Sequence, residues 1–433
     1  MADRSSVLAG PSPADYFSAV GLIALFFVTR LLIAGSLLLD QVKFVANDLS
    51  YYGYHLNRLD NGESGVMTEY PVPAVWILQA LYTLGGGWQH WAWIYVGFFL
   101  LLDAAVAISL FRRGNASGAL FWILFTGASG AIVWYRFDLI PAALVAWACL
   151  LVGSHPRIAG GLIGLGAAIK LWPALLIGPL LAPHPLRDTA GRKRLVGFVV
   201  IGLGLAAASL LTSGWSRSAS PITWQSERGL QIESVPASPL MFLRTFTHRA
   251  DWTPFLSEYN ALELSGPGVG FMLTVSTVLV AASIVATIHL SVRLLRHATS
   301  ESPALDQAML LAVLTIVLLT IIANKTLSPQ YVLWLGGPIA ALLALPTAPW
   351  LRRHLAVVAA SVLVVAGLTQ FTYPWGAYGI MAIPQGSGPE TSVLLLRNAM
   401  LVALGGYAYW LTLRASRRAA FETADLRRVE TIG

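Results

Sequence analysis

Charged residues are scarce in this sequence. They make up 11% of its 433 residues, whereas 56% are hydrophobic. A soluble domain carries about a quarter charged residues, so the composition excludes an ordinary soluble enzyme and predicts an all-α polytopic membrane protein. Cysteine is scarcer still, because the single Cys149 excludes an intramolecular disulfide and a cluster of thiolate metal ligands.

The motifs of nucleotide-dependent enzymes are missing as well. The sequence has no P-loop, no dinucleotide-binding glycine fingerprint, no HExxH and no Asp-x-Asp pair of the kind that holds a metal-bound sugar nucleotide. An enzyme built on this chain would therefore take an activated substrate from the lipid phase or from outside the cell. We expect it to use no cofactor and no bound metal.

The formal net charge of +7 does not indicate a nucleic-acid partner. Basic residues lie mostly in short loops between apolar segments, which is the distribution that the positive-inside rule describes for cytoplasmic loops. The partner that this pattern predicts is the lipid bilayer.

The apolar runs and their basic flanks predict ten transmembrane helices, since a span needs about 20 apolar residues. We expect them at residues 17–39, 92–111, 117–134, 139–153, 195–213, 271–292, 308–323, 331–345, 355–371 and 392–413. The short run 71–85 is expected to be interfacial or re-entrant. The run 158–181 is broken near Lys170 and has basic loops beyond both ends, which predicts a re-entrant helical hairpin.

This topology predicts a single transmembrane domain at residues 17–414 in the plasma membrane. The N-terminus (1–16) and the tail (415–433) are expected in the cytoplasm. Two long polar loops, 40–91 and 214–267, are expected on the extracytoplasmic side, and the first is acidic and should contain interfacial helices. Because the cytoplasmic loops are short, any chemistry is expected on the outer side.

Four groups of short motifs occur in order along the chain. They are NDLSYY at 47–52 with EYP at 69–71, RFDLIP at 136–141, GLGAAIKLWP at 164–173 and LSPQY at 327–331. Together they resemble glycosyltransferase family 87 of the GT-C superfamily, and the likeness extends over residues 17–415. The family includes polyprenyl-phosphate-mannose-dependent α-mannosyltransferases, such as PimE-like enzymes that act on phosphatidylinositol mannosides. The resemblance implies an inverting transfer from a polyprenyl phosphate sugar to a glycolipid or polysaccharide, with an aspartate base in the first external loop.

Asp48 is the catalytic residue that we expect from this resemblance. A carboxylate within hydrogen-bond reach can take the proton of an acceptor hydroxyl in the transition state. The alternative is that Asp48 only caps the helix that follows it, since aspartate is a preferred N-cap residue. Glu69 and Tyr51, in the same loop, are expected to contact substrate.

Lys170 is the expected phosphate-binding residue. A lysine at membrane depth beside a proline break is unfavourable unless it faces a cavity or an anion. In a transferase it would pair with the phosphate leaving group, whose charge grows as the glycosidic bond breaks. The alternative is that its side chain snorkels to the membrane interface.

The other substrate-binding candidates lie in external segments. Arg136 and Asp138 either form an ion pair with each other or bind the phosphate and sugar of the donor. The segment 224–234 mixes an aromatic ring, amides and charges, which suits sugar recognition but also suits a merely soluble loop. In that segment and in the loop after residue 323, the candidates are Trp224, Gln225, Glu227, Arg228, Lys325 and Gln330.

A lipid or sugar transporter is the second function class. Many spans with buried charge and a broken helix also describe carriers, which commonly show interrupted helices in two corresponding halves. The sequence indicates one interruption, at Lys170, and this asymmetry favours an enzyme. Arg30 and Asp103 lie within expected spans, and we expect them to pair in a structural role.

Overall fold

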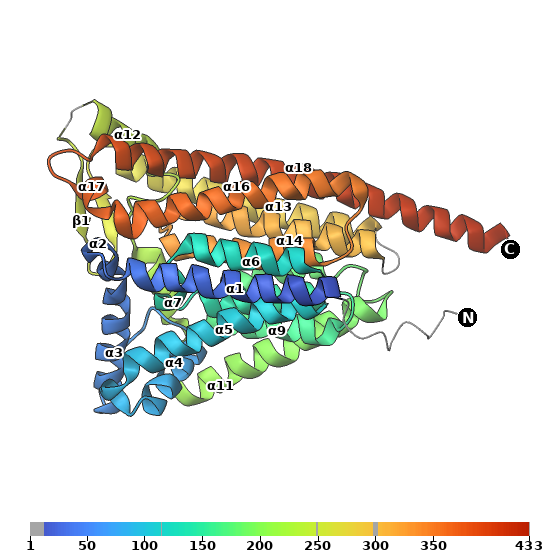
Figure 1. Ribbon diagram of the computed structural model, residues 1–433, viewed down its shortest axis with the longest axis horizontal. Coiled ribbons are helices and arrows are strands. Elements are labelled where there is room, and N and C mark those ends of the chain that lie inside the picture. The colour runs from blue at the N-terminus through green and yellow to red at the C-terminus, as the bar shows by residue number, and fades with distance from the viewer. Residues whose placement is uncertain (1–12, 114, 248–249, 298–301, 433) are drawn as a thin grey trace.

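The computed structural model describes residues 13–113, 115–247, 250–297 and 302–432, so most of the expected N-terminal segment lies outside the described residues. Long helices run side by side along one axis, and shorter elements gather at one end (Figure 1). In chain order the helices are α1 (Pro13–Ser36), α2 (Asp40–Lys43), η2 (Phe44–Ala46), α3 (Asn47–Asp60), α4 (Val72–Leu84), η3 (Gly87–Gln89), α5 (Trp91–Arg113), α6 (Ala116–Ser129), α7 (Ile132–Tyr135), α8 (Leu139–Leu151), α9 (Pro156–Ile169), η4 (Trp172–Leu176), α10 (Ile177–Leu180), α11 (Thr189–Glu227), α12 (Ser238–Phe246), α13 (Val269–His297), α14 (Pro303–Ala323), η5 (Pro329–Leu335), α15 (Gly336–Ala344), α16 (Pro349–Gln370), η6 (Phe371–Trp375), α17 (Ala377–Met381) and α18 (Gly388–Ile432).

Seven helices in the described chain are long and apolar enough to cross a membrane, which confirms a predominantly helical, polytopic membrane protein. They contain the segments Ser18–Ser36, Trp91–Arg113, Thr189–Glu227, Val269–Arg296, Pro303–Ala323, Pro349–Trp375 and Gly388–Ala420. Three further expected spans, 117–134, 139–153 and 331–345, correspond to shorter apolar helices. The total of ten spans therefore stays a prediction.

The chain turns back near Lys170. Helix α9 ends at Ile169, and Lys170 has an extended backbone with φ −153° and ψ 126°. Arg194 then donates hydrogen bonds to the carbonyls of Val152 before the turn and of Ala182 after it, at 3.0 and 2.6 Å. Both ends of this segment thus meet at one end of the bundle. Its place in the membrane as a re-entrant hairpin stays a prediction.

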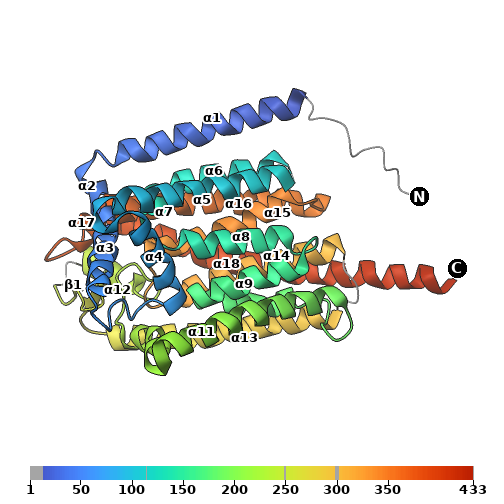
Figure 2. The ribbon, with the colours of Figure 1, turned by 90° about the horizontal axis from the view of Figure 1, so that it is seen from below.

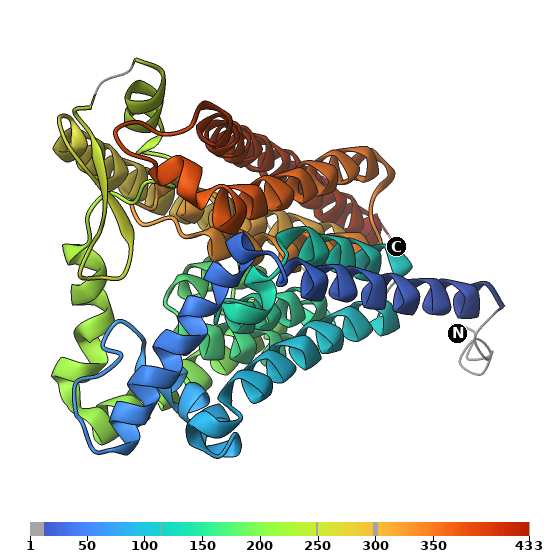
Figure 3. The same cartoon turned by 60° about the vertical axis from the view of Figure 1, so that its left-hand side comes forward.

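The two ends of the bundle differ in character. At the end that we call the site end, α2, α3, α12, α17 and the strands β1 (Thr253–Leu256) and β2 (Leu262–Ser265) lie beyond the long helices (Figure 1). Both termini of the described chain lie toward the opposite end, which we call the basic end (Figures 1 and 2). Helix α3 runs across the long helices rather than along them (Figure 3).

The expected external loop 214–267 is largely regular structure. Helix α11 continues to Glu227 through a kink at Gly214, where φ is +72° and ψ is 174°. Beyond it, α12 and an antiparallel pair of strands, β1 and β2, follow. This small sheet is an addition to a chain that is otherwise predominantly helical, as expected. Together with α17 and α18, the segment forms a second, smaller hydrophobic core of Leu230, Ile232, Ala237, Leu240, Met241, Trp252, Leu264, Ile380 and Leu394.

Helix α18 continues from the bundle to Ile432, through most of the residues expected to form the cytoplasmic tail (415–433). The cytoplasmic location of this tail stays a prediction. Inside the bundle, Arg30 and Asp103 form an almost fully buried ion pair, as predicted. Arg30 Nε donates to Asp103 Oδ2 at 3.0 Å, and Trp122 Nε1 donates to Oδ1 at 2.8 Å. Since a buried charge is tolerated only when it is paired, this contact is structural.

Candidate active site

Asp48 lies in the first turn of α3, at the site end. The N-cap residue of α3 is Ala46, which makes no side-chain cap bond, so the alternative that Asp48 caps this helix is wrong. Its carboxylate instead forms an ion pair with Arg136, a residue 88 positions further along the chain. Asp48 is 18% exposed and Arg136 is 11% exposed, so the pair is largely buried but reachable.

Arg136 follows α7, where the backbone becomes extended. One Nη donates a hydrogen bond to the hydroxyl of Tyr373, and the guanidinium carbon lies 5.2 Å from the centre of the Tyr373 ring. The expected alternative of an ion pair between Arg136 and Asp138 is wrong, because each residue has a partner from a distant segment. Arg136 Nε has no hydrogen-bond partner within the described part of the chain.

Lys170 binds the second acid of the site. Its Nζ donates to Asp138 Oδ1 at 2.6 Å, and Trp334 Nε1 donates to the same oxygen at 2.8 Å. The ammonium also lies 4.9 Å from the centre of the Tyr331 ring. Asp138 is 4% exposed and Lys170 is 25% exposed. Lys170 is therefore paired with a buried carboxylate, which contradicts the snorkelling alternative.

Three stacked rings support this lysine. Trp172 stacks on Trp334 with centroids 4.5 Å apart, and Tyr331 stacks on the same indole at 4.2 Å. The rings come from η4 and η5, the two irregular segments that follow breaks in the helical path. Because rotation of a stacked ring is restricted, the hydrogen bond that Trp334 Nε1 donates to Asp138 keeps a fixed direction.

The two acid–cation pairs are linked through the chain, because Arg136 and Asp138 are separated by one residue. Arg136 contacts helix α3 through Asp48, and Asp138 contacts the broken helix through Lys170. Two carboxylates and two cations from segments far apart in sequence thus meet at the site end. Such an arrangement can bind an anion through the cations and accept a proton on a carboxylate.

Tyr51 and Glu69 form a third contact, between α3 and the segment that precedes α4. The Tyr51 hydroxyl donates to Glu69 Oε1 at 2.5 Å. Burial, and then the neighbouring Glu69 charge, raise the pKa of Tyr51 well above its usual value. Tyr51 therefore stays a neutral donor. The ring of His55 lies 4.3 Å from that of Tyr51, and burial lowers the pKa of His55.

The part of α11 beyond Gly214 fixes the backbone around Glu69. Arg217 donates hydrogen bonds to the carbonyls of Met67 and Tyr70, both at 3.0 Å. Helix α4 starts directly after this segment, with a proline in its first turn, where a missing N–H is tolerated.

The candidates at the end of α11 contact the loop after α14. Gln225 Nε2 donates to Thr326 Oγ1 at 2.6 Å, and Lys325 Nζ donates to the carbonyl of Ser226 at 2.9 Å. Burial lowers the pKa of Lys325. Glu227 is exposed. These contacts bring the two loops together but do not place them against the Asp48 pair.

The remaining candidates of this region lie around the strands. Trp224 meets Tyr259 edge-on, with ring centroids 5.0 Å apart. Arg228 Nε lies 3.9 Å from Glu263 Oε1. Gln330, next to the stacked Tyr331, carries a buried Oε1 that no described residue hydrogen-bonds.

Two residues of the site, and Glu263 of the strand region, were missed by the sequence analysis. Tyr373 and Trp334 reach the acid–cation pairs through long-range packing, for which the sequence contains no local signal. Glu263 did have a local sequence signal. The alternation Leu262-Glu263-Leu264, preceded by a polar turn, is typical of a strand with one buried face.

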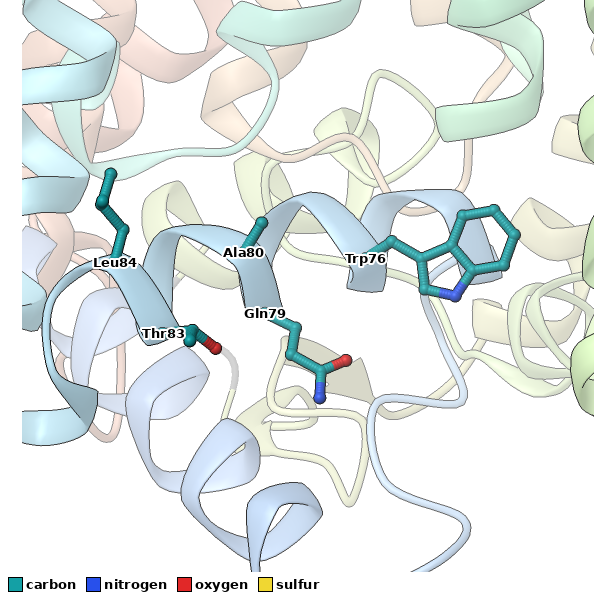
Figure 4. A pocket seen from close by; sticks show the side chains of 5 residues that line it. All are labelled: Trp76, Gln79, Ala80, Thr83 and Leu84. Atoms are coloured by element: carbon teal, nitrogen blue, oxygen red, sulfur yellow. The ribbon is translucent and has the colours of Figure 1, made fainter.

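An open groove of about 720 Å³ lies on α4 and contains none of these residues (Figure 4). It is lined by Trp76, Gln79, Ala80, Thr83 and Leu84. Since it offers no charged group, we do not assign the reacting centre to it.

Among the described residues, no group of three His, Cys, Asp or Glu side chains could bind a metal ion. A metal-free reaction stays a prediction.

Comparison with known proteins gives one match. The family model described as "Glycosyltransferase family 87" matches residues 67–321, which is more than half of the 433-residue chain. The matched range includes Glu69, Arg136, Asp138 and Lys170, and it begins after Asp48. No curated protein and no solved structure matches the chain.

Proposed function

This chain belongs to glycosyltransferase family 87 and is a membrane glycosyltransferase, and from this premise we propose its reaction. It transfers a sugar with inversion from a polyprenyl phosphate donor to a glycolipid or polysaccharide acceptor. Asp48 is the general base. Mannose is the proposed sugar because the sequence motifs resemble mannosyltransferases of the family.

The observation that carries this proposal is the meeting of the pairs Asp48–Arg136 and Lys170–Asp138 at the site end. A polyprenyl phosphate sugar offers a phosphate beside the reacting carbon, so its enzyme needs cations next to a base. Arg136 and Lys170 supply the cations, and each is partly exposed. The unpartnered Nε of Arg136 offers a further donor for a phosphate oxygen.

The proposed step conserves atoms and charge. The acceptor hydroxyl oxygen forms a bond to the anomeric carbon, while the bond from that carbon to the phosphate oxygen breaks and its electron pair stays on the phosphate. The hydroxyl proton moves to Asp48. Arg136 and Lys170 stabilise the negative charge that develops on the phosphate. When Arg136 turns to the phosphate, the Asp48 carboxylate loses its ion-pair partner and becomes a better base.

The proposed active site faces the extracytoplasmic side of the plasma membrane. Basic residues from several loops gather at the opposite end, where Arg113 donates to Ser154 at 3.2 Å and Arg414 lies 5.2 Å from the Trp350 ring. Cytoplasmic loops are enriched in such residues, which supports this orientation.

One observation favours the alternative of a lipid or sugar transporter. The span expected at 331–345 begins with η5, an irregular helix, so the break at Lys170 has a counterpart later in the chain. Carriers bind substrate at such interruptions. We prefer the transferase because the family is a glycosyltransferase family.

The test is a transfer assay with purified protein in detergent. The acceptor is mannosylated phosphatidylinositol, and the donors compared are polyprenyl phosphate mannose and GDP-mannose. We expect product with the lipid-linked donor alone, at the same rate with and without EDTA. Product from GDP-mannose, or a strict requirement for a divalent cation, would contradict the proposed donor class or the metal-free mechanism. Absence of product from both donors would contradict the mannosyl-transfer reaction.

A further inference from the structure

The two-stranded sheet brings one acidic side chain into a buried position. Gln231 forms an antiparallel bridge with Glu263 of β2, and the backbone N–H of Leu264 donates to the carbonyl of Leu230 at 2.9 Å. Directly opposed residues in an antiparallel pair point to the same face. Glu263 is 4% exposed and Gln231 is 6% exposed, so this face is covered.

Polar atoms at or near this face lack hydrogen-bond partners among the described residues. Glu263 Oε1 and Arg228 Nε are both buried without a hydrogen bond from any described residue. They lie 3.9 Å apart, which exceeds the usual length of a direct hydrogen bond. The Oε1 of Gln330 is buried and unpartnered in the same way. A buried polar group of this kind normally has a partner, which is often a ligand or ordered water.

These atoms are connected to the proposed active site. Ser328 Oγ donates to Gln231 Oε1 at 3.5 Å, and Gln330 follows two residues later. The next residue, Tyr331, provides the ring beneath Lys170. The loop after α14 thus connects the strand face to the proposed phosphate-binding lysine.

Two aromatic rings lie near these residues. Trp224 and Tyr259 are half-buried and in edge-on contact, and the half-buried Lys325 donates to the carbonyl of Ser226, two residues after Trp224. Aromatic rings pack against the apolar faces of sugar rings, while the polar atoms behind them select hydroxyl groups.

We propose that Arg228, Glu263 and Gln330 form a subsite for the hydroxyl groups of the acceptor sugar. The inference rests on the proposed transferase function. A hydroxyl both accepts and donates a hydrogen bond. One hydroxyl can therefore accept from Arg228 Nε and donate to Glu263 Oε1 across the 3.9 Å between them, and a second can donate to Gln330 Oε1.

A purely structural ion pair is the competing explanation. A salt bridge that only stabilised the sheet would be expected to close to hydrogen-bond distance, as the pair of Arg397 Nη1 and Glu233 Oε2 does at 3.0 Å. In contrast, Arg228 Nε and Glu263 Oε1 lie 3.9 Å apart, and neither atom has a hydrogen-bond partner among the described residues. A hydroxyl group would supply a partner to both.

The first experiment measures sugar binding without the donor. Full-length protein in detergent is mixed with α-linked mannobiose or maltose, and saturation-transfer NMR reports contact. We expect at least one disaccharide to bind wild-type protein, and Glu263→Gln and Gln330→Ala each to weaken it roughly tenfold. The matched control is Glu258→Gln, an exposed carboxylate in the turn of the same hairpin, which should bind as wild type does.

The second experiment separates this inference from the transferase proposal. With polyprenyl phosphate mannose and mannosylated phosphatidylinositol, Glu263→Gln should raise the acceptor KM roughly tenfold and leave the donor KM unchanged. No disaccharide binding, or variants with wild-type binding and acceptor KM, would overturn the subsite while transfer by the wild type persists. A wild type that transfers no sugar overturns the proposed function, and the acceptor assignment with it.

Discussion

Lys170 is the residue that we propose binds the donor phosphate. Replacing it with methionine removes the charge that would meet the phosphate, so we expect kcat/KM for the polyprenyl phosphate donor to fall about 100-fold, with a small change in the acceptor KM. Kinetics with each substrate varied in turn measure this. An equal loss for both substrates would contradict the phosphate role.

The control addresses Asp138, which Lys170→Met would leave buried and unpaired. The double variant Lys170→Met with Asp138→Asn removes both charges, and we expect its melting temperature to recover toward the wild-type value, since an unpaired buried charge destabilises more than the loss of the whole pair. Donor use should stay impaired. Recovery of donor use in the double variant would show that Lys170 acts only by pairing with Asp138.

For single residues, the sequence could identify the charged groups of the site but not the partners with which they pair. Asp48, Arg136, Asp138 and Lys170 were all predicted as site residues, because charges are rare and conspicuous in an apolar chain. The pairing was not predicted. Local rules suggested an ion pair between Arg136 and Asp138 and a capping alternative for Asp48, whereas tertiary contacts decided both.

Gly214 forms the kink of α11, which we interpret as a hinge. This helix contains Trp224 and ends next to Arg228. Its backbone lies at φ +72° and ψ 174°, a region that is nearly restricted to glycine. We expect Gly214→Ala to destabilise the protein by about 1–3 kcal/mol. It should also weaken acceptor binding, because the helical extension beyond the hinge would be displaced. Thermal unfolding in detergent and acceptor KM measure the two effects.

The matched control is Gly204→Ala in the same helix. A Cβ at Gly204 meets no atom within 4 Å, and the residue lies in regular helix. We expect unchanged or slightly higher stability, since alanine favours helix over glycine. Equal effects of the two substitutions would contradict the assignment of Gly214 as a strained hinge.

Among the elements, the sequence analysis found the break at Lys170 and missed the sheet. A lysine followed by a proline inside an apolar run is a strong local signal, because proline removes a helical hydrogen bond. The strands Thr253–Leu256 and Leu262–Ser265 are short and lie in a polar segment, so they were interpreted as loop. Glu263, which the sheet places in a buried position opposite Gln231, was missed for the same reason.

The orientation of the whole molecule can be tested with the single native cysteine left in place. Cys149 is fully buried, so a membrane-impermeant maleimide should not label wild-type protein in intact cells. We expect Glu258→Cys, at the site end, to be labelled. Arg353→Cys, at the basic end, should be labelled only after the cells are opened. The reverse pattern would place the site in the cytoplasm.

The polytopic class was predictable from composition, since few globular proteins combine 56% hydrophobic with 11% charged residues. The number of spans was harder to predict. Helices such as α6 (Ala116–Ser129) and α8 (Leu139–Leu151) are shorter than the expected spans, because glycine, proline and irregular turns divide the apolar runs. Hydropathy alone does not show where a helix breaks.

The central claim is that Asp48 is the base for sugar transfer. Its most direct test compares the rate of product formation by wild type, Asp48→Asn and Asp60→Asn, with polyprenyl phosphate mannose and mannosylated phosphatidylinositol. Asp60 is the exposed last residue of the same helix, α3, and its variant controls for charge and folding. We predict a loss of about 10²–10⁴-fold for Asp48→Asn, because an amide cannot accept the proton, and wild-type rates for Asp60→Asn. Full activity of a folded Asp48→Asn protein would contradict the account.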